Sequence, residues 1–137
     1  TELFSNRFQR HQITLDCTSV FLSSQVDCFP STIYPVLINL VDNAMFWLAT
    51  IKPPRVVRLD AQAATLIITN NGPAIEERDA QRIFERGFSR RPGGRGLGLF
   101  IAKKALEAEE MSLSIEPPPV GFNVSFHITI PTLKLIP

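Results

Sequence analysis

The sequence predicts an α+β fold, a two-layer α/β sandwich with helices on one face of a mixed, mainly antiparallel sheet. Two observations support this prediction. Segments with strand-like and helix-like apolar spacing follow the order strands, helix, strand pair, helix, loop, helix, strand pair. That order lacks the regular strand–helix alternation of a doubly wound parallel sheet. The 137 residues, 45% of them hydrophobic and 20% charged, suit one hydrophobic core.

The first half of the chain is predicted to hold one long helix among short strands. The helix opens at Pro30-Ser31-Thr32, where a hydroxyl can cap it, and continues to Leu48 with apolar residues at helical spacing. Pro53-Pro54 follows as a stop signal. Apolar and β-branched runs predict five strands, the third the weakest, at residues 13–16, 20–23, 25–29, 56–59 and 65–69.

The second half begins with a strong turn signal at residues 70–73. A short helix is predicted from Glu76 to about Glu85, with acidic residues in its first turn as the helix dipole prefers. The glycine-rich segment 87–98 predicts a mobile loop, and helical spacing resumes at Leu97. Two strands, at residues 112–115 and 123–130, complete the pattern around a proline-rich bend.

Bulk properties narrow the function classes. A formal net charge of +1 argues against a nucleic-acid binder, which is usually far more basic. The sequence holds no transmembrane-length apolar run and no signal-peptide pattern. Cys17 and Cys28 are expected to be buried thiols, with a single bridge as the alternative. The chain starts at Thr1 without a methionine, so we expect a piece of a longer protein.

Asn39 and Asn43 lie four residues apart in the predicted long helix and therefore share one face. A buried carboxamide without a partner costs about 1–3 kcal/mol, so a pair of satisfied structural asparagines is the commoner interpretation of this pair alone. The alternative is a ligand site, because an amide oxygen suits a magnesium ion that shares its shell with phosphates and waters.

Two loop motifs also admit two interpretations. Asn70-Asn71-Gly72-Pro73 has ordinary turn composition, but Asn70 at a strand end can also face a base edge while Gly72 lets the backbone approach a ligand. The segment 94–99 is either a flexible linker or a set of converging N–H groups that bind phosphate at a helix start. It lacks the βαβ context of a dinucleotide fingerprint and the ending of a P-loop.

A cluster of cations surrounds this second motif. The stretch from residue 86 to residue 104 contains no acidic side chain. A solvated basic face is the common explanation, whereas concentration beside a glycine-rich loop favours a polyphosphate ligand. The cations are Arg86, Arg90, Arg91, Arg95, Lys103 and Lys104.

Four segments, in this order and spacing, resemble the boxes of the ATP-binding catalytic domain of sensor histidine kinases, whose wider family includes Hsp90, type II topoisomerases and MutL. The resemblance covers about residues 12–131 and implies a Bergerat-type ATP-binding fold, with residues 1–137 forming a single domain. The segments resemble the N box at 39–44, the first glycine box at 70–75, the F box at 82–88 and the second glycine box at 94–99.

The resemblance implies one site for ATP and Mg²⁺. Asn43 would ligate the metal, Asn39 would support the metal or the phosphates, and both are the expected catalytic residues. Asn70 would contact the adenine amino group, and residues 84–96, called the lid below, would close on the phosphates. The expected nucleotide-binding residues are Asn43, Asn70, Gly72, Ala74, Ile75, Phe84, Arg90, Arg91, Gly94, Arg95, Gly96, Leu97, Gly98 and Leu99.

The sequence departs from the family pattern at four places. Asn70 stands where the family has an adenine-reading aspartate, and Ala74 replaces a glycine. Phe46 stands where a basic residue is usual, and Phe46-Trp47 is predicted to pack in the core. Gly121 is displaced from its usual place before the last strand.

Asn39 also decides between branches of the family. ATP-hydrolysing members carry a glutamate there as general base toward water, and an amide cannot accept that proton. Phosphoryl transfer to histidine asks mainly for positioning and charge neutralisation, so the kinase branch fits better. An Hsp90- or MutL-like ATPase switch, and a degenerate non-catalytic binding domain, stay open as alternatives.

The kinase interpretation implies partners outside this chain. His127 lies in a strand pattern and His11 in a linker, so the acceptor histidine is expected on a separate dimerisation domain of the parent protein, with a response-regulator receiver domain downstream. We expect a cytoplasmic domain without nucleic-acid or membrane contacts of its own, whether or not the parent protein is membrane-anchored.

Overall fold

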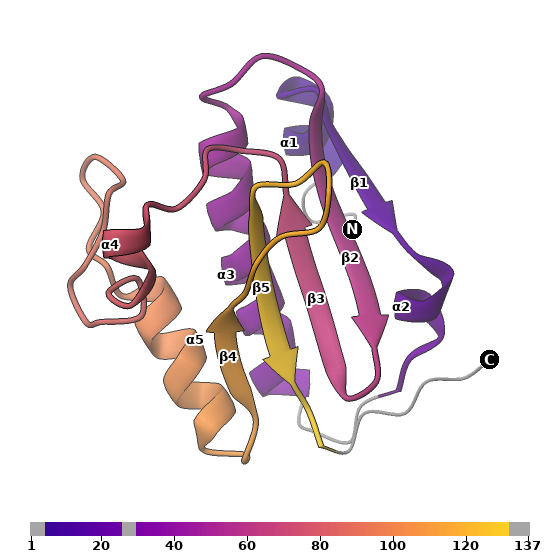
Figure 1. Ribbon diagram of the computed structural model, residues 1–137, viewed down its shortest axis with the longest axis vertical. Coiled ribbons are helices and arrows are strands. Elements are labelled where there is room, and N and C mark those ends of the chain that lie inside the picture. Colours follow the sequence, from indigo (N-terminus) through magenta and orange to yellow (C-terminus); the bar gives the residue numbers. More distant parts are fainter. Residues whose placement is uncertain (1–4, 26–29, 132–137) are drawn as a thin grey trace.

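The computed structural model describes residues 5–25 and 30–131. Cys28 and residues 26–29 of the predicted third strand lie outside these ranges. Within these ranges five strands form one sheet in the order β1-β2-β3-β5-β4, with helices packed behind it (Figure 1). The strands are β1 (Ile13–Cys17), β2 (Arg55–Gln62), β3 (Thr65–Asn70), β4 (Ser112–Ile115) and β5 (Val124–Thr129).

The sheet is mixed and mainly antiparallel, as predicted. β1 runs parallel to β2, with Leu15 opposite Val57, because a long helix connects the two strands. The other three pairs are antiparallel, and β3 lies between β2 and β5. The polar end of β3 therefore lies beside the start of β5, with Asn70 opposite Val124.

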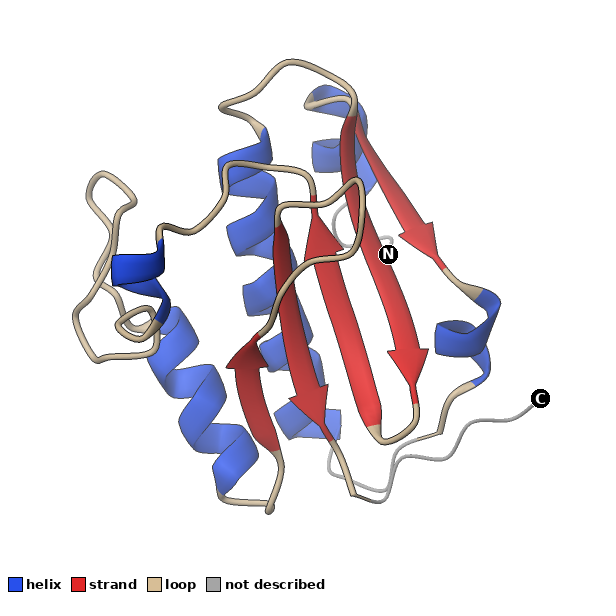
Figure 2. Ribbon diagram, viewed as in Figure 1, coloured by secondary structure: helices blue, strands red, loops and turns tan. Residues whose placement is uncertain are grey.

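In the described part of the chain five helices accompany the sheet, and the two longest cover one face of it (Figure 2). They are α1 (Ser5–Arg10), α2 (Ser19–Ser23), α3 (Pro30–Leu48), α4 (Glu77–Ala80) and α5 (Gly98–Glu107). The predicted long helix therefore agrees with α3 at both ends. Pro35 is accommodated near its first turn, where a missing backbone N–H costs little.

The apolar face of α3 forms the centre of the core. Leu40, Met45 and Leu48 are at most 1% exposed, and Ile68 of β3 and Phe126 of β5, which face them, are at most 2% exposed. Burying such side chains contributes about 1.5–3 kcal/mol each before entropy is counted. This packing fixes α3 against the sheet and thereby sets the position of its polar edge, which carries Asn39 and Asn43.

The structure corrects one sequence-based prediction, adds one helix and shortens another element. The run 20–23 is not a strand but lies in α2, because Thr18 caps a helix there by accepting a hydrogen bond from the Phe21 N–H at 3.2 Å. α1 was not predicted. α4 ends at Ala80, and hydrogen-bonded turns follow it as far as Glu85. A single helix was expected over this whole segment.

Candidate functional site

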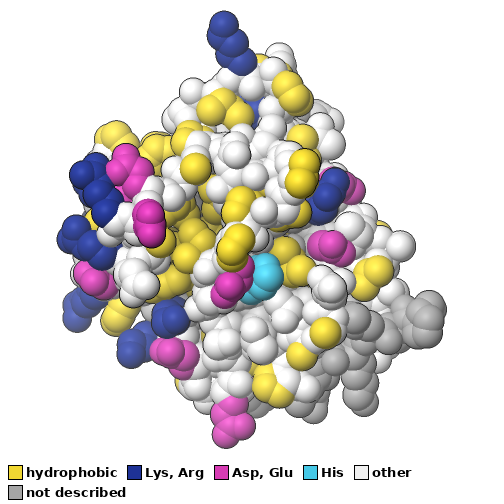
Figure 3. Space-filling model, in the orientation of Figure 1, with side chains coloured by type: hydrophobic (Ala, Val, Ile, Leu, Met, Phe, Trp, Pro, Cys, Tyr) yellow, Lys and Arg dark blue, Asp and Glu magenta, His cyan; other side chains and the backbone are white. Residues whose placement is uncertain are grey.

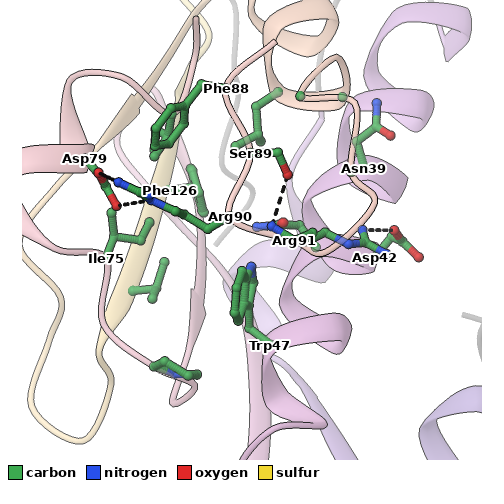
Figure 4. Close-up of a pocket in the computed structure, with 18 of the residues that line it drawn as sticks. Asn39, Asp42, Trp47, Ile75, Asp79, Phe88, Ser89, Arg90, Arg91 and Phe126 are labelled. Carbon is green, nitrogen blue, oxygen red and sulfur yellow. Dashed lines mark hydrogen bonds and ion pairs between the residues drawn. The ribbon is translucent and has the colours of Figure 1, made fainter.

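A cavity of about 620 Å³ opens between α3, the segment after β3, the lid and the start of α5 (Figure 4). Its volume lies in the range typical of small-molecule sites. Val124 and Phe126 of β5 line its floor. The four segments predicted to form a nucleotide site from separate parts of the sequence therefore contribute to one cavity.

The polar edge of α3 forms one wall. Asn39 and Asn43 are half-buried and line the cavity, one helical turn apart. Within the described ranges neither carboxamide has a side-chain hydrogen bond to the protein, so both are available to a ligand. Asp42, between them, also lines the cavity and places a carboxylate in the same wall.

The end of β3 forms the opposite, deeper wall. Asn70 is only 4% exposed, and its Oδ1 accepts a hydrogen bond from the Gly72 N–H at 2.8 Å. A Cβ on Gly72 would lie 2.9 Å from that oxygen, so glycine is needed for this close approach. Asn123 holds the turn from the other side, since its Nδ2 donates to the Gly72 carbonyl at 3.1 Å. The turn is thus held by contacts on both sides.

The lid is closed at its base by backbone contacts. The Gly87 N–H donates to the Gly96 carbonyl at 2.9 Å. Gly96 has φ of +67°, and a Cβ there would lie 2.5 Å or less from backbone atoms of Gly87 and Phe88, so only glycine fits. Within the lid, the Ser89 hydroxyl accepts from the Arg91 N–H at 3.1 Å. The predicted loop therefore has a defined, internally bonded shape.

Two lid arginines point to opposite walls of the cavity (Figure 4). Arg90 makes a two-pronged ion pair with Asp79, with N–O distances of 3.0 and 2.9 Å. Arg91 reaches Asp42 of α3 at 3.1 Å and lies over the Phe46 ring, 4.2 Å from its centroid. The lid thus bridges α3 and the α4 region.

The Arg90 ion pair has electrostatic consequences. Hydrogen bonding from Arg90 holds the pKa of Asp79 below its ordinary value, and the carboxylate raises the pKa of Arg90 in turn. Arg95 is exposed, lines the cavity and has no acidic partner in the part of the chain that the structure describes. It is therefore the lid cation most available to an anionic ligand.

Every residue predicted for the site lines the cavity except Gly72 and Phe84. Gly72 is buried behind Asn70, and Phe84 packs edge-on against Phe126 with ring centroids 6.3 Å apart. The predicted basic cluster is divided as well. Lys103 donates to the Leu113 carbonyl at 2.9 Å, and neither it, Arg86 nor Lys104 lines the cavity. On the surface, lysine and arginine side chains gather over α4 and the lid, beside the cavity (Figure 3).

Sequence reasoning missed several cavity residues. The prediction that Phe46 and Trp47 pack in the core was wrong, because both are half-buried and outside it, and Trp47 lines the cavity. Their rings meet edge-to-face at 5.0 Å. The helical spacing of Trp47 from Asn43 was the available signal, since residues four apart share a face. The other main omissions are Asp42, Asp79, Phe88 and Ser89.

Residues 29–134 match the family described as histidine kinase-, DNA gyrase B-, and HSP90-like ATPase. This match spans more than half of the sequence. The chain belongs to this ATPase family.

Proteins similar to this ATPase-family domain include sensor kinases. The histidine-protein kinase/phosphatase MprB of Mycobacterium sp. (strain KMS) is 32% identical over 114 residues, covering 74% of this chain and 21% of MprB. A solved mycobacterial sensor histidine kinase MprB has 27% identity and a TM-score of 0.74, covering 98% of this chain and 92% of that chain. These relatives favour the histidine-kinase branch over the Hsp90 and MutL branches.

A third likeness concerns the fold. The histidine kinase ThkA, solved in complex with the response regulator protein TrrA, has 24% identity and a TM-score of 0.74, covering 96% of this chain and 37% of that chain. The ATPase-family domain spans about a fifth of the length of the curated MprB relative. Within residues 5–25 and 30–131, no helix has the length and apolarity needed to cross a membrane.

Proposed function

We propose that this domain binds Mg-ATP and presents the γ-phosphoryl group to a histidine on a dimerisation domain outside the chain. The observation that carries the proposal is the convergence on one cavity of two helix carboxamides, the buried Asn70 and the arginine-bearing lid. Asn70 would contact the base, and Asn39 and Asn43 would lie toward the phosphates. Binding at this cavity positions the nucleotide, which is the main source of catalysis in phosphoryl transfer.

The donor set of the α3 wall fits magnesium. No group of three or more histidine, cysteine or acidic side chains gathers into a metal site in the described residues. Magnesium bound with a nucleotide needs few protein ligands, because phosphates and waters fill most of its shell. The free carboxamide oxygen of Asn43 would hold the ion, and Asn39 would support it. When bound, the ion neutralises charge on the phosphates.

The lid and the start of α5 suit the phosphates. The backbone from Leu97 to Leu99 lines the cavity at the N-terminal end of α5, where the helix dipole favours negative charge. Arg95 adds a guanidinium that has no acidic partner among the described residues. Arg90 and Arg91 would bind a phosphate only after leaving their carboxylate partners. The free energy of breaking these ion pairs would therefore lower the affinity for the nucleotide.

The acceptor is proposed to lie on another domain because neither histidine lines the cavity. His127 lies in β5 between Ile67 and Ser114, and His11 lies between α1 and β1. Asn39 in the place of a water-activating glutamate supports transfer to histidine over hydrolysis. A cytoplasmic setting and a downstream response-regulator receiver domain are part of the proposal, as the ThkA–TrrA complex suggests for the partner.

Thermal unfolding with ATP tests the proposal, because a ligand that binds the native state raises its stability. We expect ATP with magnesium to raise the melting temperature, and Asn43→Ala to remove the magnesium-dependent part of the rise. Gln62→Ala, at the exposed far end of β2, is the control and should respond like the wild type. No shift at millimolar Mg-ATP would refute the function and leave a non-catalytic interaction domain. Rapid phosphate release would instead indicate an ATPase switch.

A further inference from the structure

We propose that Asn70 removes the preference of this site for adenine, so that a purine nucleotide with a carbonyl at position 6, such as an inosine or guanosine nucleotide, binds at least as tightly as ATP. The inference rests on the proposed function, in which Asn70 contacts position 6 of the base. It concerns which purine the site takes and leaves the phosphate and magnesium contacts unchanged.

The orientation of the Asn70 carboxamide is fixed by its neighbour. Its Oδ1 lies 2.8 Å from the Gly72 backbone nitrogen, and an N–H group can donate only to an acceptor. Turning the amide over would bring Nδ2 against the Gly72 N–H, two donors facing each other in a buried turn. The oxygen is therefore the atom directed to Gly72, and the nitrogen is the other end of the group.

The surrounding turn prevents Asn70 from adapting. The Asn123 N–H donates to the Asn70 carbonyl at 3.0 Å, while the Asn123 side chain holds the Gly72 carbonyl at 3.1 Å. The close packing at Gly72 leaves no room for the Oδ1 atom to shift toward it. The backbone on both sides of the carboxamide is thus tied to the loop before β5.

The remaining Nδ2 of Asn70 is the donor that this wall of the cavity can offer to a ligand. Asn70 lines the cavity while only 4% of its surface is exposed, and its Nδ2 has no hydrogen-bond acceptor among the described residues. A nearly buried donor gains most from a ligand that supplies an acceptor. The base edge that meets Asn70 is therefore favoured when it carries an oxygen.

Adenine and hypoxanthine differ in the hydrogen-bonding group at position 6 of the base. The amino group at position 6 of adenine donates, so it meets the Asn70 NH₂ as donor against donor. The carbonyl of hypoxanthine or guanine accepts and pairs with it. An aspartate at this position would keep one oxygen for Gly72 and offer a second oxygen to the adenine amino group. A single change of atom, oxygen to nitrogen, thus reverses the hydrogen-bonding sense of this wall.

The test compares ATP with inosine triphosphate, which differs from ATP only in the atoms and proton at positions 1 and 6. Dissociation constants with magnesium are measured by calorimetry on the whole chain, for the wild type and for Asn70→Asp. Gln62→Glu is the control, since it adds the same charge at the far end of β2. The carboxylate introduced by Asn70→Asp can still accept from the Gly72 N–H, so the variant is expected to fold.

We expect the wild type to bind inosine triphosphate at least as tightly as ATP. Asn70→Asp should shift the ratio toward ATP by about tenfold or more, the effect of a mispaired buried group, while Gln62→Glu leaves the ratio unchanged. A wild type that prefers ATP tenfold, with the same ratio in Asn70→Asp, would overturn this inference and leave Mg-ATP binding intact. Failure of the wild type to bind either nucleotide would overturn the proposed function itself.

Discussion

Replacing Asp42 by asparagine should strengthen nucleotide binding. Asp42 holds Arg91 at 3.1 Å across the cavity, so a triphosphate must compete with this carboxylate for the guanidinium group. The substitution keeps the size of the side chain and removes its charge. Arg91 then becomes available to the phosphates, and the repulsion between Asp42 and the ligand disappears.

The magnitude follows from the exposure of the pair. The side chains of Arg91 and Asp42 are 37% and 34% exposed, so solvent screens their attraction. Pairs of this kind contribute about 0.2–1 kcal/mol. Since 1.4 kcal/mol corresponds to a tenfold change, we expect binding about 1.4- to fivefold tighter for Asp42→Asn. The gain should shrink near 1 M salt, where the Debye length falls to about 3 Å.

Calorimetric titration with Mg-ATP at low and high salt measures this effect. Asp16→Asn is a matched control, because Asp16 pairs with Arg58 at 2.8 Å with similar exposure, 43% and 39%, away from the cavity. It removes the same charge and should leave the affinity unchanged at about 0.15 M salt, where distant surface charges are largely screened. Weaker or unchanged binding by Asp42→Asn would refute the competition between carboxylate and phosphate.

Three further predictions concern the lid and the core. Gly96→Ala should weaken nucleotide binding far more than Gly93→Ala, because both glycines have positive φ but only Gly96 is surrounded by backbone; equal losses by titration would contradict this. Arg90→Gln should lower the melting temperature at pH 7, and the difference should disappear as the pH falls through the lowered pKa of Asp79, because protonation of that carboxylate breaks the pair; a constant difference across pH would count against it. Leu48→Ala should cost about 2–5 kcal/mol in urea unfolding and Leu22→Ala, at a 70% exposed position, about 0.5 or less; similar costs would show that Leu48 is not central to the core.

Local patterns predicted much of this molecule because they depend on neighbours in sequence. The apolar spacing of α3 and the placing of Asn39 and Asn43 one turn apart needed no knowledge of the tertiary structure. The end of β3 at Asn70 was likewise visible from the turn composition that follows. These features agree with the structure because local preference and packing favour the same conformation.

Other features depended on contacts that no local pattern contains. From the sequence, the arginines of the lid were expected to be available to phosphate, but the structure pairs Arg90 and Arg91 with carboxylates. The partner of Arg91 is Asp42, 49 positions away in the sequence, so no local pattern could reveal this pair. α2 forms where a strand was expected because Thr18, its cap, also donates to Asp60 of β2 at 2.7 Å. The β2–β3 turn contains Ala63 at a φ of 53°, without the glycine or asparagine that usually reveals such a turn.

The hydrogen bond between Gly87 and Gly96 gives the lid a thermodynamic property of its own. It closes residues 87–96 into a ring, so much of the loop-closure entropy is lost during folding. A ligand that reaches this ring has less chain disorder to remove and keeps more of its contact energy as affinity.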